Sequence, residues 1–82
     1  MSNNKDFGRV LKKLRTEKGL SQEEFGFESN LHRTYISQLE RGLKSPSLET
    51  LGQIAAALGI PASRLIALTE GSRSARSTSG KE

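Results

Sequence analysis

Glycine residues divide this chain into segments of helical length. Gly19, Gly42 and Gly59 each follow a stretch whose apolar residues recur at helical spacing, and Lys18 suits the last turn of the first stretch. Runs of β-branched residues, which favour strands, are absent. The 82 residues are therefore expected to form one small all-α domain with a modest core, which leaves little room for an enzymatic cleft.

Apolar periodicity and capping signals predict where the helices lie. The first helix is expected over residues 6–18 and the last over residues 62–68. Between them, one helix should begin at Ser45 or Ser47, since either serine can cap it. Two more helices between residues 21 and 41 complete an expected five-helix bundle.

A short helix, a tight turn and a second helix are predicted between residues 21 and 41. Ser21 and Glu24 can form a capping box, in which the hydroxyl of Ser21 accepts from the backbone N–H of Glu24 and the carboxylate reaches back. Gly26 would let this helix cross its neighbour closely, and Asn30 tolerates the positive φ of a tight turn. This order predicts a helix-turn-helix.

The second of these helices, expected over residues 32–41, has two unlike faces. Ile36 and Leu39 fall together at about 100° per residue, so their side is expected to be buried. The opposite side carries only hydrogen-bonding groups and no acid: Arg33, Thr34, Ser37, Gln38 and Arg41. Such groups read base edges and hold phosphates in the major groove of DNA. A solvent-exposed face that lacks acids by chance is the alternative interpretation.

Composition favours a nucleic-acid partner over catalysis or membrane insertion. The chain has 13 basic and 9 acidic residues, a net charge of +4 that favours a polyanionic partner. With no cysteine, one histidine and no glycine-rich phosphate loop, we expect no enzymatic activity, no metal and no cofactor. No apolar run approaches the roughly 18 residues of a membrane span, and the N-terminus lacks a signal peptide's apolar core. A cytoplasmic location is expected.

Three motifs, in this order and spacing, resemble the Cro/C1-type (XRE-type) helix-turn-helix family. They are Leu20-Ser21-Gln22-Glu23-Glu24, Tyr35-Ile36-Ser37 and Glu40-Arg41-Gly42. The resemblance covers about residues 7–68 and is strongest to restriction–modification controller proteins and phage repressors. It implies a compact five-helix domain of the lambda-repressor type. It also implies a transcriptional regulator that binds a near-palindromic DNA operator as a homodimer.

The resemblance implies roles for individual residues of this chain. Contacts with DNA bases are implied for His32, Arg33, Thr34, Ser37 and Gln38. Contacts with the DNA backbone are implied for Gln22, Tyr35, Arg41, Lys44 and Ser47, and a structural ion pair for Arg15 and Glu40. His32 departs from the family, in which Ser, Thr or Asp commonly caps this helix. Either the helix start is looser here or the imidazole contacts DNA.

The C-terminal part offers a surface for self-association and a tail. Ile66 and Leu68 do not share the expected inward face of Leu65, so they are candidates for a dimer surface, although single exposed apolar residues are common. We expect residues 1–69 to form the DNA-binding domain and residues 70–82 a flexible tail rich in serine and basic residues.

Two classes of function remain open from the sequence. The first is a sequence-specific regulator of transcription, for which RNA polymerase is a further candidate partner. The second is a protein-interaction module, such as an antitoxin, that binds another protein and has secondary affinity for DNA. Binding to random DNA, compared with capture of a protein partner, would separate the two.

Overall fold

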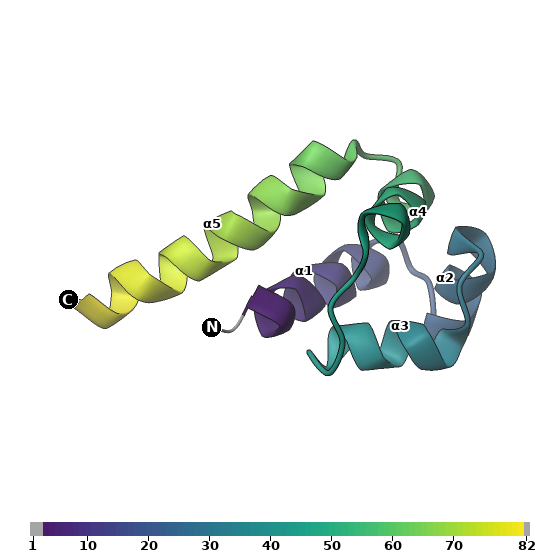
Figure 1. Ribbon diagram of the computed structural model, residues 1–82, viewed down its shortest axis with the longest axis horizontal. Helices are drawn as coiled ribbons and strands as arrows, with labels where there is room; N and C mark the ends of the chain where they lie inside the picture. Colours follow the sequence, from purple (N-terminus) through teal and green to yellow (C-terminus); the bar gives the residue numbers. More distant parts are fainter. Residues whose placement is uncertain (1–2, 82) are drawn as a thin grey trace.

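The computed structural model describes residues 3–81, with the side chains of residues 4–72. This part of the chain forms five helices: α1 (Asn3–Glu17), α2 (Gln22–Ser29), α3 (Arg33–Glu40), α4 (Leu48–Leu58) and α5 (Ala62–Lys81). No strand occurs between residues 3 and 81, so the predicted all-α class is confirmed. In Figure 1, α3 lies along the lower edge of the molecule, and α5 passes α1 on the side away from α3.

A single hydrophobic core receives side chains from every helix. Its fully buried apolar members are Leu11 of α1, Phe25 of α2, Ile36 and Leu39 of α3, Ile54 of α4 and Leu65 of α5. Burial of one side chain of this size contributes about 1.5–3 kcal/mol. Ile36 and Leu39 are buried as predicted, and they fix which side of α3 turns outward.

Side-chain caps set the starts of α2 and α4. The hydroxyl of Ser21 accepts from the backbone N–H of Glu24 at 3.0 Å, and the N–H of Ser21 donates to the Glu24 carboxylate at 2.8 Å. The predicted capping box is therefore confirmed. Of the two serines considered for α4, Ser47 is the cap, because its hydroxyl accepts from the N–H of Thr50 at 3.1 Å. A cap of this kind is worth about 1 kcal/mol.

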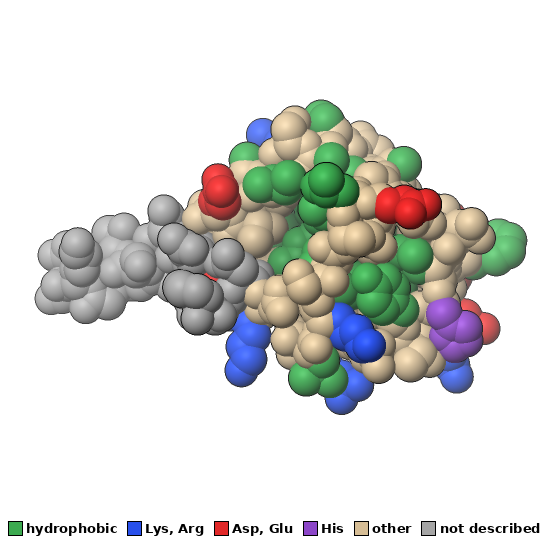
Figure 2. Space-filling view, in the orientation of Figure 1, with side chains coloured by type: hydrophobic (Ala, Val, Ile, Leu, Met, Phe, Trp, Pro, Cys, Tyr) green, Lys and Arg blue, Asp and Glu red, His purple; other side chains and the backbone are tan. Residues whose placement is uncertain are grey.

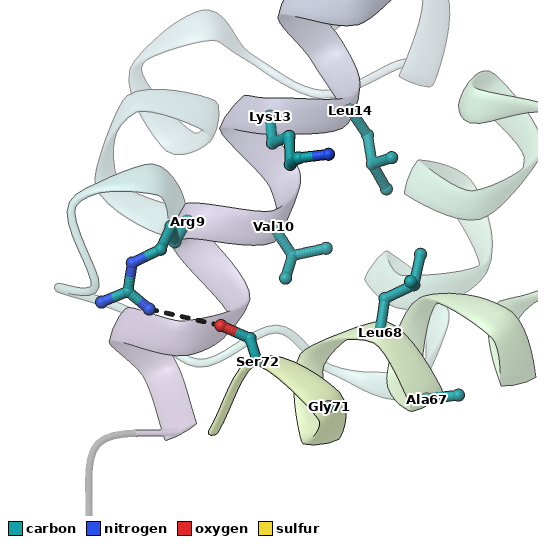
Figure 3. Close-up of a pocket in the computed structure, with 8 residues that line it drawn as sticks. All are labelled: Arg9, Val10, Lys13, Leu14, Ala67, Leu68, Gly71 and Ser72. Atoms are coloured by element: carbon teal, nitrogen blue, oxygen red, sulfur yellow. Dashed lines mark hydrogen bonds between the residues drawn. The ribbon is translucent and has the colours of Figure 1, made fainter. Parts of the chain in front are cut away.

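The first and last helices are longer than predicted. α1 begins at Asn3 and not near Asp6. α5 continues to Lys81, whereas the sequence predicts an end near Leu68. The helix continues past Leu68 alongside α1, where the guanidinium of Arg9 donates to the hydroxyl of Ser72 at 3.4 Å (Figure 3). The flexibility of residues 70–82 stays a prediction, and residues 1, 2 and 82 lie outside the described part.

Leu68 is less exposed than the sequence suggests. Its side chain is partly buried against the core, and Figure 3 shows it facing Val10 and Leu14 of α1 across a shallow groove of about 380 Å³. This contact arises because α5 runs along α1 beyond the expected helix end. Ile66, the other candidate for a dimer surface, is 40% exposed. The outward apolar surface of α5 is therefore smaller than predicted.

Two helix crossings require the absence of a side chain. A Cβ atom on Gly26 would lie 2.6 Å from the carbonyl oxygen of Leu31. The close crossing predicted at this glycine is therefore confirmed. A Cβ atom on Gly8 would lie 2.5 Å from the carbonyl oxygens of Leu39 and Glu40. The second crossing brings α1 against the backbone of α3, and it was not predicted.

Candidate nucleic-acid interface

The turn between α2 and α3 is held by hydrogen bonds from both sides. Asn30 has a φ of 62°, and among the described residues it is the only non-glycine with a positive value. The N–H of Leu31 donates to the carbonyl of Gly26 at 2.8 Å. From α4, the amide of Gln53 donates to the carbonyl of Ser29 at 3.2 Å. The predicted helix-turn-helix is therefore present, and a hydrogen bond from α4 holds the end of α2 next to its turn.

His32 caps the start of α3. Its Nδ1 atom accepts from the backbone N–H of Thr34 at 3.0 Å, with backbone angles φ −68° and ψ 143° that are usual for a cap. The helix start is thus closed by a side chain, as it would be with serine or aspartate. The imidazole itself remains exposed at the surface.

The residues predicted to contact bases share one accessible ridge of α3. His32, Arg33 and Thr34 are exposed, and Ser37 and Gln38 are partly exposed. Because Ile36 and Leu39 hold the opposite side in the core, the four of these side chains that lie within α3 are directed away from the domain. His32 is exposed because it caps the N-terminal end of the helix. We call these five residues the α3 ridge. It offers guanidinium, hydroxyl, amide and imidazole groups, and none of its members is acidic.

A buried ion pair anchors the C-terminal end of α3 to α1. The Nε atom of Arg15 lies 2.6 Å from one carboxylate oxygen of Glu40, and Nη2 lies 3.0 Å from the other. Their side chains are 8% and 3% exposed. Nη1 of Arg15 donates to the carbonyl of Leu20 at 2.7 Å, so the guanidinium also holds the chain just before α2. The expected ion pair is present.

Gln22 belongs to the same network. Its Nε2 atom donates to the Glu40 carboxylate at 3.0 Å, to the oxygen that also accepts from Arg15. This bond uses one of the two N–H groups of the amide. Gln22 is the first residue of α2 and is partly exposed, and this bond holds its side chain at the C-terminal end of α3.

The remaining predicted contacts to the DNA backbone differ in their surroundings. Arg41 and Lys44 are exposed just after α3, whereas Tyr35 is partly buried against the core. The hydroxyl of Ser47 accepts from the N–H of Thr50 and donates to its Oγ1 at 2.9 Å. A contact from Ser47 to a phosphate would therefore come from its backbone N–H at the start of α4.

Comparison with known proteins agrees with this geometry. The sequence model of a family described as helix-turn-helix matches residues 11–65. The chain belongs to the Cro/C1-type helix-turn-helix family. It is 52% identical over 60 residues to control protein C.MunI of Mycoplasma sp, an alignment that covers 72% of this chain and 81% of the relative.

Solved structures of restriction–modification controller proteins share its fold. C.AhdI from Aeromonas hydrophila superposes with a TM-score of 0.76 at 42% identity, covering 79% of this chain and 98% of that one. The C.Esp1396I tetramer in complex with its natural 35 base-pair operator gives 0.79 at 30% identity, covering 88% and 95%. This member of the family is thus a DNA-binding transcriptional regulator of the controller and repressor type.

Lys5 is a further exposed cation at the end of α3, and no local pattern in the sequence singles it out. It is exposed on α1, and its Cγ would lie 2.7 Å from a Cβ on Gly42, so its stem packs at the end of α3. Figure 2 shows most of the visible Lys and Arg side chains along the lower edge, where α3 lies in Figure 1. Only the crossing of α1 and α3, which brings distant residues together, could have identified Lys5.

The described residues contain neither a cluster of metal ligands nor a single helix suited to crossing a membrane. No three His, Cys, Asp or Glu side chains of this part are grouped so that they could hold a metal ion. Within the same residues, no single helix is long and apolar enough to cross a membrane.

Proposed function

We propose that this regulator binds a near-palindromic double-stranded operator as a homodimer, with α3 in the major groove of each half-site. The observation that carries the proposal is the α3 ridge, an accessible row of five acid-free, hydrogen-bonding side chains. Its orientation is fixed by Ile36 and Leu39 in the core and by the ion pair of Glu40 with Arg15.

We assign recognition of the DNA base sequence to the α3 ridge. The guanidinium of Arg33 can donate two hydrogen bonds to O6 and N7 of a guanine, and the amide of Gln38 can pair with N6 and N7 of an adenine. Each pairing is worth roughly 1–3 kcal/mol of discrimination. The hydroxyls of Thr34 and Ser37 can each exchange a hydrogen bond with a base, and the methyl group of Thr34 can contact that of a thymine.

Positioning on the duplex is assigned to the residues around the ridge. The exposed side chains of Arg41, Lys44 and Lys5 would neutralise phosphates. The amide of Gln22, which is held by Glu40, would donate a hydrogen bond to a further phosphate. These contacts release counterions, so affinity should fall steeply with salt. They position the domain without selecting a sequence.

Dimerisation is assigned to α5. Ile66 is exposed on this helix, and two copies joined there would present two ridges to one face of DNA. For a two-fold arrangement, the recognition helices should lie about 34–36 Å apart, one turn of the duplex. The operator complex of the related controller protein C.Esp1396I is a tetramer, which supports an oligomer on DNA here.

The proposed action is docking without chemistry, in the cytoplasm, with no cofactor. An operator-bound dimer would act at a promoter by blocking or recruiting RNA polymerase. Selection from a pool of randomised duplexes, together with sedimentation of the free chain and its complex, tests this function. The expected result is an inverted repeat bound by two chains. Recovery of no shared sequence, or of a site bound by a single chain, would refute the proposal.

A further inference from the structure

The cap at the start of α3 determines which atom of His32 can face DNA. We propose that its hydrogen bond with Thr34 holds the neutral imidazole in the tautomer with the proton on Nε2, and presents that N–H to an acceptor on DNA. The inference rests on the proposed docking of α3 in the major groove. It makes one ring both the cap of the recognition helix and a contact with the nucleic acid.

The tautomer follows from the direction of the cap bond. The backbone N–H of Thr34 can only donate, and it lies 3.0 Å from Nδ1 of His32. Nδ1 must therefore be the nitrogen without a proton, and in a neutral ring the proton then resides on Nε2. The cap is the one hydrogen bond made by the His32 side chain among those between described residues.

The position of the ring makes DNA its most suitable acceptor. His32 is exposed and directly precedes Arg33 at the N-terminal end of the recognition helix, the end whose residues contact base edges in helix-turn-helix proteins. Phosphate oxygens, N7 and O6 of guanine and O4 of thymine all accept hydrogen bonds there. Because the cap already fixes the ring, little rotamer entropy is lost on binding.

The tautomer can be measured on the free protein. His32 is the single histidine of the chain, so long-range ¹H–¹⁵N NMR spectra at pH 8.5 report this ring alone. In the folded chain we expect one tautomer, with the proton on Nε2, and in the chain unfolded by urea a mixture of two. A proton on Nδ1, or the same mixture in both states, would overturn the proposal before any DNA is added.

Two substitutions separate the cap from the donor. In His32→Asn, the side-chain oxygen takes the place of Nδ1 and keeps the cap, but no donor reaches the place of Nε2. In His32→Gln, the amide nitrogen reaches that place, but the cap acceptor is lost. We expect His32→Asn to melt close to the wild-type temperature and to bind DNA about three- to tenfold more weakly.

The order of the two variants is the decisive readout. His32→Gln should have the lower melting temperature and yet bind DNA more tightly than His32→Asn, an inversion that a purely structural role of His32 would not produce. The probes are the duplex selected with the wild-type chain and a duplex of random sequence. Weaker binding of His32→Asn to both indicates a phosphate acceptor, and weaker binding to the selected duplex alone indicates a base edge.

Arg33→Ala separates a wrong role for His32 from a wrong docking of α3. Wild-type affinity of His32→Asn on both duplexes would overturn the donor role. If Arg33→Ala nevertheless binds the selected duplex more weakly than the wild type, the docking of α3 in the major groove still holds. If Arg33→Ala also bound like the wild type, the docking itself would be refuted, and the role of His32 with it.

Discussion

Arg15 and Glu40 form a two-point ion pair, at 2.6 and 3.0 Å, between two side chains that are almost completely buried. The pair joins α1 to the last residue of α3, and Gln22 of α2 donates to the same carboxylate. One acidic residue thus joins three helices at the end of the α3 ridge. This network therefore adds to the apolar core in fixing the orientation of the ridge.

Glu40→Gln should destabilise the domain by about 3–5 kcal/mol, because it leaves the buried guanidinium of Arg15 without its counter-charge. Urea denaturation measures the change. The matched control is Glu17→Gln, which removes the partner of Lys13 in an exposed pair of 2.9 Å and should cost at most about 1 kcal/mol. Equal effects of the two substitutions would show that the buried pair has no special part in stability.

Gly8→Ala should destabilise the domain by about 1–3 kcal/mol, since the added Cβ would lie 2.5 Å from the backbone of α3 and push the two helices apart. Thermal unfolding measures the effect. Gly52→Ala is the control, because a Cβ on Gly52 of α4 meets nothing within 4 Å and alanine is a better helix former. Gly52→Ala should stabilise the chain slightly; the same direction for Gly8→Ala would contradict the close crossing.

Lys5→Ala should weaken binding to any duplex and reduce the slope of log K against log salt by about 0.9, the value for one phosphate contact on duplex DNA. The reason is the position of Lys5 at the end of α3. Titrations at several salt concentrations give the slope. Lys13→Ala is the control, because Lys13 faces α5 and pairs with Glu17. An unchanged slope for Lys5→Ala would remove Lys5 from the interface.

Ile66→Glu should shift the free chain towards monomer by placing a charge on the proposed dimer surface of α5. Sedimentation equilibrium measures the association. Phe27→Glu is the control, since Phe27 is 88% exposed on α2, which the proposed dimer does not use. Dissociation by Phe27→Glu and not by Ile66→Glu would move the interface from α5 to α2.

Residues close together in the sequence were enough to predict the structure at the centre of the chain. The cap of Ser21, the turn at Asn30 and the buried side of α3 each depend on residues within about one or two helical turns. For this reason the helix-turn-helix and the four ridge residues within α3 could be predicted before any contact between helices was known. The family resemblance supplied His32 and the pair of Arg15 and Glu40, which lie 25 residues apart.

The features that were not predicted depend on how α1 packs against α3 and α5. The role of Gly8, the place of Lys5 beside Gly42 and the partial burial of Leu68 all follow from the positions of α3 and α5 against α1. None of these positions carries a local signal, because the contacts that define them come from other helices. The length of α5 escaped for the same reason, since Ser72 gains its partner from α1.

The exposed ridge of α3 is expected to read bases, and the cations around it to hold phosphates. Arg33→Ala and Lys44→Ala, each assayed on the selected duplex and on random DNA, separate these two roles. Arg33→Ala should lose roughly 1–3 kcal/mol more on the selected duplex than on random DNA, and Lys44→Ala should lose the same on both. Equal losses on both duplexes for Arg33→Ala would show that Arg33 holds a phosphate and does not read a base.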